Sequence, residues 1–184
     1  MRAAMLVLMA AVLGASGCDG KGPTAPTAPA APASPAASYA VTTVSITSDP
    51  EDFVGRGRSM TFTLENSQFT ANVNSDGAYL SLVIRPRSGT LPVWSFLVTS
   101  PKGSRISPGT YPTTRSFLSD GWAADFGGDG RGCGRTTGRI VVHAFDFIEV
   151  NQALKNFRAS FEQHCEGAPP VLRGEVAVLA DPWR

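Results

Sequence analysis

The 184-residue chain has few of the residues that most often carry chemistry, with three cysteines, two histidines and no excess of charge. It contains no Gly-x-Ser-x-Gly run and no glycine-rich phosphate loop, so nothing indicates a serine hydrolase or a P-loop enzyme. Its 16 Lys and Arg residues face 15 Asp and Glu residues. A neutral surface gives no electrostatic basis for binding nucleic acid or anionic lipid, so neither is expected as a partner.

Helical periodicity is also missing. Nowhere does a 3.6-residue apolar pattern persist for the 10–12 residues that a helix requires. The apolar run from Ala3 to Leu13 follows Arg2 and precedes small residues. It is shorter than the roughly 20 residues that span a membrane. This pattern is typical of a signal peptide, which we place at residues 1–17.

The end of this segment predicts a lipid anchor at Cys18. Ala15-Ser16-Gly17-Cys18 resembles a lipobox, although Ala15 stands where leucine is usual. Such a site would attach diacylglycerol and palmitate to the cysteine. The alternative is ordinary secretion, which leaves Cys18 as a stray thiol. An unpaired exposed cysteine is a liability in an oxidising compartment, and this favours lipidation.

A linker is predicted between this anchor and the folded domain. Residues 18–40 comprise the cysteine and this linker, and residues 19–40 consist almost entirely of Pro, Ala, Thr, Gly and Ser. Such a segment buries too little apolar surface to offset its ordering entropy, so we expect a disordered, extended linker. In polyproline geometry it would reach roughly 60 Å from the bilayer.

From residue 41 the apolar pattern has a period of two, which indicates strands. Turn residues such as those of Asn74–Gly77 separate the alternating runs. We therefore expect an all-β domain over 41–184, an antiparallel β-sandwich of about eight or nine strands, with a small β-barrel as the alternative. The expected strands are 41–47, 59–64, 67–73, 78–84, 92–99, 108–111, 136–150, 155–165 and 171–179.

Residues 112–135 are the least regular part and are expected to form a long loop that ends near Cys133. The strand 155–165 ends at Cys165, and a turn at 151–154 would place that cysteine opposite residues near Gly138. Exported domains normally pair their remaining cysteines, which favours a Cys133–Cys165 disulfide. The competing interpretation is a zinc site with His143 and His164, but the compact spacings of zinc ligands are absent.

Two motifs carry a resemblance to a known family. The runs GGDGRGCG and FRASFEQHCEG, with DPEDFVGRGRSMTFT and SPGTYPTTRSF upstream, resemble a family of secreted bacterial all-β domains of unknown activity, which are often lipoproteins. The resemblance covers roughly Val44 to Val178. It supports the domain boundaries and the disulfide, and it implies no substrate, cofactor or catalytic residue.

The residues around the glycine-rich loop are the candidates for a ligand site or a structural loop. They are Trp122, Asp125, Phe126, Asp129 and Arg131. A binding module would expose the aromatic residues. The carboxylates could bind calcium, but the glutamate of an EF-hand loop is absent, and Asp–Arg pairing that braces the loop is the favoured interpretation.

These observations predict a membrane-anchored lipoprotein of the bacterial envelope that faces the periplasm or the exterior. Its expected role is non-catalytic binding or envelope structure, with a carbohydrate or an envelope protein as partner. No cofactor, metal or catalytic residue is expected. The alternative is an extracytoplasmic carbohydrate-active hydrolase in which Glu162 and Glu166 each pair with a second carboxylate. His143, within an apolar strand, is expected in the core.

Overall fold

The computed structural model of the chain describes residues 42–89, 92–115 and 120–179. The predicted signal peptide, Cys18 and the linker up to residue 40 lie outside the described residues. None of the described residues forms a helix of the length and apolarity needed to cross a membrane. Ten strands make up the described part: β1 (Thr43–Ser48), β2 (Ser59–Thr63), β3 (Ser67–Val73), β4 (Tyr79–Pro86), β5 (Trp94–Thr99), β6 (Gly109–Arg115), β7 (Ala123–Gly128), β8 (Thr136–Ile148), β9 (Ala153–Cys165) and β10 (Leu172–Leu179).

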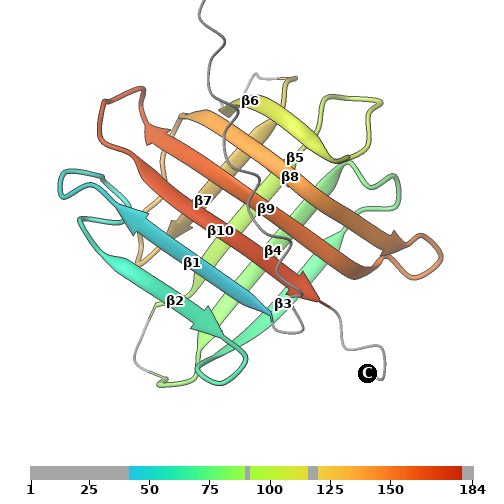
Figure 1. The fold of residues 1–184 in the computed structure, drawn as a ribbon, viewed down its shortest axis with the longest axis horizontal. Helices are drawn as coiled ribbons and strands as arrows, with labels where there is room; N and C mark the ends of the chain where they lie inside the picture. The colour runs from blue at the N-terminus through green and yellow to red at the C-terminus, as the bar shows by residue number, and fades with distance from the viewer. Residues whose placement is uncertain (1–41, 90–91, 116–119, 180–184) are drawn as a thin grey trace, which may run out of the picture. The chain divides into compact units, whose positions relative to one another are not determined.

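The strands form two antiparallel sheets that face each other (Figure 1). One sheet has six strands in the order β2-β1-β10-β9-β8-β6, and the other has four in the order β3-β4-β5-β7. Both sheets have open edges, so the fold is a β-sandwich, and the small closed barrel is wrong. Pro112 lies in the edge strand β6, as expected for a residue that cannot donate to a neighbouring strand.

The core lies between the sheets and is built by alternate residues of the strands, as the period of two predicts. On β9 the side chains of Phe157, Ala159 and Phe161 are buried, and on β5 those of Trp94 and Phe96 are buried. The Phe96 and Phe161 rings, from opposite sheets, lie 4.7 Å apart between centroids. Burial of this kind contributes about 1.5–3 kcal/mol for each large apolar side chain, which makes it the main stabilising term.

The prediction of a long irregular loop over 112–135 is wrong, because β7 lies within it. This strand pairs with β5 along its whole length, from Thr99 opposite Ala123 to Trp94 opposite Gly128. Its sequence AADFGG has small residues at four of six positions, so no alternation of large and small side chains marks it. The absence of a side chain at Gly128 is required, because a Cβ there would overlap the Trp94 ring.

The β8–β9 hairpin turns two residues earlier than predicted. Ile148 pairs with Ala153, so the turn spans Glu149–Gln152, and Gln152 adopts a positive φ of 56° there. Cys165 consequently pairs with Thr136. A bulge after Val142 turns His143 outward, where it is exposed, so the prediction of a core histidine is wrong.

Candidate functional site

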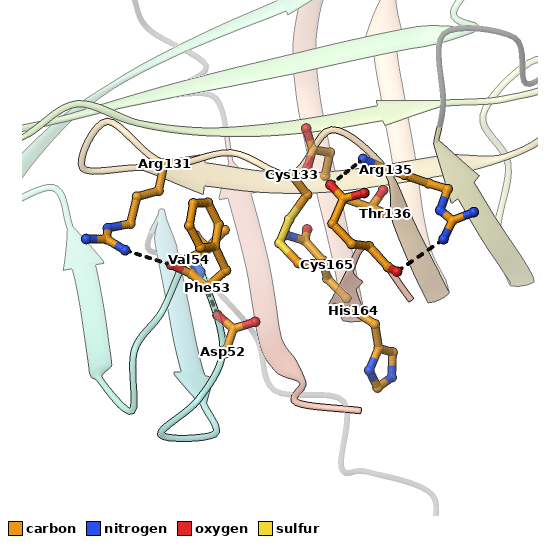
Figure 2. The surroundings of a disulfide bond; sticks show 12 residues. Asp52, Phe53, Val54, Arg131, Cys133, Arg135, Thr136, His164 and Cys165 are labelled. Atoms are coloured by element: carbon orange, nitrogen blue, oxygen red, sulfur yellow. Dashed lines mark hydrogen bonds between the residues drawn. A yellow bond between two sulfur atoms is a disulfide. The ribbon is translucent and has the colours of Figure 1, made fainter. Parts of the chain in front are cut away.

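A disulfide joins Cys133, in the loop after β7, to Cys165, the last residue of β9 (Figure 2). The two Cα atoms lie 5.2 Å apart across a sequence separation of 32 residues, which confirms the predicted pairing. Both sulfurs are therefore unavailable to a metal, and the zinc alternative is wrong. His164 points away from Cys165, and its Nδ1 lies 3.1 Å from the Ala168 carbonyl oxygen.

Hydrogen bonds fix the loop on both sides of the disulfide. The Arg135 amide donates to Glu166 Oε1 at 3.0 Å, and the Glu166 amide donates to the Arg135 carbonyl at 2.8 Å. The Arg135 guanidinium also donates to the Glu166 carbonyl at 3.1 Å. At the other side, the amides and carbonyls of Gly128 and Arg131 bond reciprocally, each at 2.9 Å. The glycine-rich segment is thus a set of tight turns, and Gly130 supplies a positive φ of 68°.

Gln163 connects the two sheets beneath this loop. Its side chain is 1% exposed, accepts a hydrogen bond from the Phe126 amide at 2.6 Å and donates to the Phe126 carbonyl at 2.9 Å. Gln163 Nε2 also lies 3.5 Å from Cys133 Sγ. The alternating pattern places Gln163 inward, but its partner cannot be predicted, because Phe126 belongs to the strand that the pattern does not reveal.

The predicted exposed patch of Trp122 and Phe126 does not form. Phe126 is fully buried and stacks on Trp94 with ring centroids 5.4 Å apart. Trp122 is half-buried and stacks on Tyr111 at 3.7 Å. The buried Phe126 ring offers no face to a sugar, so the prediction of an aromatic platform is wrong at this residue.

The charged residues of the loop bind other segments rather than one another. Asp125 forms an ion pair with Arg115, and Asp129 pairs with Arg58 at 3.0 Å. The Arg131 guanidinium lies 5.4 Å from the centre of the Phe53 ring and donates to the Phe53 carbonyl at 3.3 Å. Asp–Arg pairing therefore braces this end of the sandwich, through partners that are 10 residues apart in the Arg115–Asp125 pair and 71 apart in the Arg58–Asp129 pair. No three His, Cys, Asp or Glu residues in the described ranges are placed to hold a metal ion.

A cleft of about 370 Å³ opens beside the disulfide. The loop between β1 and β2 forms one wall, and the segment after β9 forms the other. We call it the disulfide cleft; its lining residues are Glu51, Asp52, Phe53, Gly132, Cys165, Glu166, Ala168 and Pro170. Three segments far apart in the chain converge here.

Two residues of this cleft, Asp52 and Phe53, were not among the predicted site residues. The Phe53 side chain is 52% exposed, although it is apolar and large. Asp52 is 2% exposed, and its Oδ1 accepts hydrogen bonds from the Val54 and Gly55 amides, at 3.1 Å and 2.5 Å. Asp52 Oδ2 is buried and has no hydrogen-bond partner in the described part of the chain. A phenylalanine beside two acids in a turn segment is the one sequence signal of this site.

Other hollows lie elsewhere on the domain. A groove of about 340 Å³ crosses the outer face of the six-stranded sheet and contains Glu162, which faces Arg139 at 3.5 Å and Arg173 at 3.8 Å. Glu162 and Glu166 thus line different hollows, and each shares its hollow with another acid, Glu175 beside Glu162 and Glu51 beside Glu166. A pocket of about 410 Å³ adjoins Trp94, and residues 90–91, between two of its lining residues, are outside the described ranges.

Comparison of the chain with protein-family models, with curated proteins and with solved structures finds no match. The resemblance to secreted bacterial all-β domains therefore stays a prediction from the motifs.

Proposed function

We propose that this chain is a lipid-anchored binding module of the bacterial cell envelope, without a catalytic role. Its Cys18 would hold the acyl chains, and residues 18–40 would carry the domain away from the bilayer. The domain would face the periplasm or the exterior and would bind an envelope protein or a carbohydrate. Oxidised Cys133 and Cys165 support export, because disulfides persist mainly in oxidising compartments.

The disulfide cleft is the observation that carries the binding proposal. It combines a half-exposed aromatic ring, Phe53, with apolar walls from Ala168 and Pro170. Aromatic anchors in such hollows contribute much of the energy of protein interfaces. The disulfide and the Arg135–Glu166 hydrogen bonds hold the walls in place before a ligand arrives, which lowers the entropic cost of binding.

Capture of partners from intact envelopes tests this proposal. The tethered wild-type protein and a Phe53→Ala variant would be used as bait, and we expect the variant to recover at least about tenfold less partner. Leu64→Ala is the matched control, because Leu64 is 51% exposed and lies in a different turn. Equal recovery by wild type and Phe53→Ala would contradict a role for the cleft. A glycan array run with the same variants covers carbohydrate partners.

The anchor is tested separately by cell fractionation. Cys18→Ser removes the thiol to which lipid would be attached, so we expect the protein to move from the membrane fraction to the soluble fraction. If the variant stayed in the membrane fraction, the lipid anchor would be wrong. Binding at the cleft is independent of this result.

A further inference from the structure

Two of the edge strands of the sandwich, β2 and β6, have their free edges blocked. The unpaired main-chain groups of an edge strand can pair with another chain, so native proteins cover or interrupt them. On β2, the Asn66 side chain accepts from the Thr63 amide at 2.8 Å and donates to the Thr61 carbonyl at 3.0 Å. On β6, Pro112 has no amide, and the Thr114 amide donates at 2.9 Å to a carbonyl of the segment before β7. Neither strand presents a continuous row of free groups.

The free edge of β7 is blocked by side chains of the other sheet and by a turn. The Gln163 side chain bonds both the amide and the carbonyl of Phe126, and Thr136 Oγ1 donates to the Ala124 carbonyl at 3.3 Å. The amide and carbonyl of Gly128 bond within the turn that follows the strand. These contacts leave no room for a further strand beside β7.

The remaining edge strand is β3, at the margin of the four-stranded sheet opposite β7 (Figure 1). It pairs with β4 alone, in a register without a bulge. At one end of this ladder the Asn74 amide donates to the Tyr79 carbonyl at 3.2 Å, and at the other the Arg87 amide donates to the Asn66 carbonyl at 2.8 Å. Because bonded and non-bonded positions alternate, the even-numbered residues of β3 bond to β4. The odd-numbered residues direct their amides and carbonyls to the free edge.

Phe69 and Ala71 form the centre of this free edge, and both are partly exposed. Ser67 and Val73, at its two ends, are buried. Within residues 42–89, 92–115 and 120–179, no hydrogen bond reaches the main chain of Phe69 or Ala71 from the free side. The strand sequence SQFTANV also has no charged residue and no proline, which are common protections of an edge. This edge is therefore open to pairing, in contrast to the other three.

We infer that β3 pairs with β3 of a second copy of this chain, antiparallel and about a two-fold axis at Thr70. The two four-stranded sheets would then join into one continuous sheet. In this register Phe69 lies opposite the second copy's Ala71, and Ala71 opposite its Phe69. Both residues have free amides and carbonyls, so each of the two pairs exchanges two hydrogen bonds. The inference goes beyond the proposed function and is independent of it.

The side chains of β3 favour a second copy over an unrelated peptide, because they match one another in this register. Gln68 lies opposite the second copy's Asn72, and both amides can donate and accept. Thr70 lies opposite Thr70, a favourable cross-strand pair. On the inner face the large Phe69 lies beside the small Ala71, and both already pack against the core, so pairing covers their exposed parts. No charge on the strand opposes the approach of two copies.

Cysteine cross-linking of the full-length exported protein tests the inference. Thr70 and the second copy's Thr70 form a non-hydrogen-bonded pair, whose Cα atoms are about 4.5 Å apart, within the range that a disulfide bridges. After mild oxidation we expect Thr70→Cys to migrate as a dimer on non-reducing gels and as a monomer after reduction. Thr61→Cys is the matched control, because Thr61 is an exposed threonine on the blocked edge strand β2. It should cross-link no more than the wild-type protein.

Two further cysteine variants test the register. Gln68→Cys and Asn72→Cys would each lie roughly 13 Å from the same residue of the second copy, at about 3.4 Å per residue, so neither should cross-link alone. Co-expressed, the two variants should form a mixed disulfide dimer. Equal cross-linking of Thr61→Cys and Thr70→Cys, or none at Thr70→Cys, would overturn the inference. Cross-linking of Gln68→Cys alone as efficiently as Thr70→Cys would overturn the two-fold axis at Thr70.

Sedimentation equilibrium in non-ionic detergent provides a test without cysteines. Thr70→Lys and Thr70→Glu each place like charges opposite each other, so each should weaken dimerisation at least about tenfold. A mixture of the two variants places opposite charges there and should restore the dimer. Thr61→Lys is the control and should dimerise as the wild type does. A monomeric wild-type protein, or charge variants that dimerise unchanged, would overturn the inference.

Discussion

Reduction of the Cys133–Cys165 disulfide should destabilise the domain by about 3.7 kcal/mol. The bond closes a loop across 32 residues. In the chain-entropy relation, a closed loop of that length lowers the entropy of the unfolded chain by about 12 cal/mol/K, which gives about 3.7 kcal/mol at 25 °C. For a domain of this size, the corresponding fall in the melting temperature is roughly 10–15 °C.

Urea unfolding of the oxidised and the reduced wild-type protein measures this difference without changing a side chain. The double variant Cys133→Ala with Cys165→Ala should lose slightly more, because the Cys165 sulfur is buried and its removal leaves a small cavity. Identical unfolding midpoints for the oxidised and reduced protein would refute the claim that the cross-link stabilises the fold.

Two further predictions concern the packing beneath the loop. Gly138→Ala should lower the free energy of unfolding by about 3 kcal/mol or more, because the new Cβ would overlap the β9 main chain. Gly130→Ala has open space around the new Cβ but keeps a positive φ, so it should lower the free energy of unfolding by only about 1–2 kcal/mol. Thermal unfolding of the two variants compares them, and equal losses would contradict the close approach of the strands. Gln163→Leu should cost about 2–5 kcal/mol, because it leaves the buried amide and carbonyl of Phe126 without partners. Gln68→Leu on the exposed face of β3 is its control and should change the free energy of unfolding by less than about 0.5 kcal/mol; a similarly small effect at Gln163 would contradict the inter-sheet link.

The fold could be predicted wherever large and small side chains alternate. β4, β5 and β9 each have three or more apolar residues at alternate positions, and all of these are buried. β7 could not be found in this way, because alanines and glycines occupy four of its six positions. Its pairing with β5 instead depends on a space that only Gly128 leaves for the Trp94 ring.

The site was predictable only in part. Two cysteines in a domain that is expected to be exported suffice to predict the disulfide, since the expected compartment and the number of cysteines limit the possibilities. The cleft is formed by three segments that meet only in the folded chain. The residues around Asp52 and Phe53 therefore do not by themselves predict that a cleft forms there. Asp129 illustrates the same limit, because its partner Arg58 lies 71 residues away.

The most direct test of the account is mass spectrometry of the exported protein, digested without reduction. The account predicts one peptide pair linked through Cys133 and Cys165 and an acylated N-terminal peptide that begins at Cys18. Free thiols at Cys133 and Cys165, or an unmodified Cys18, would contradict it.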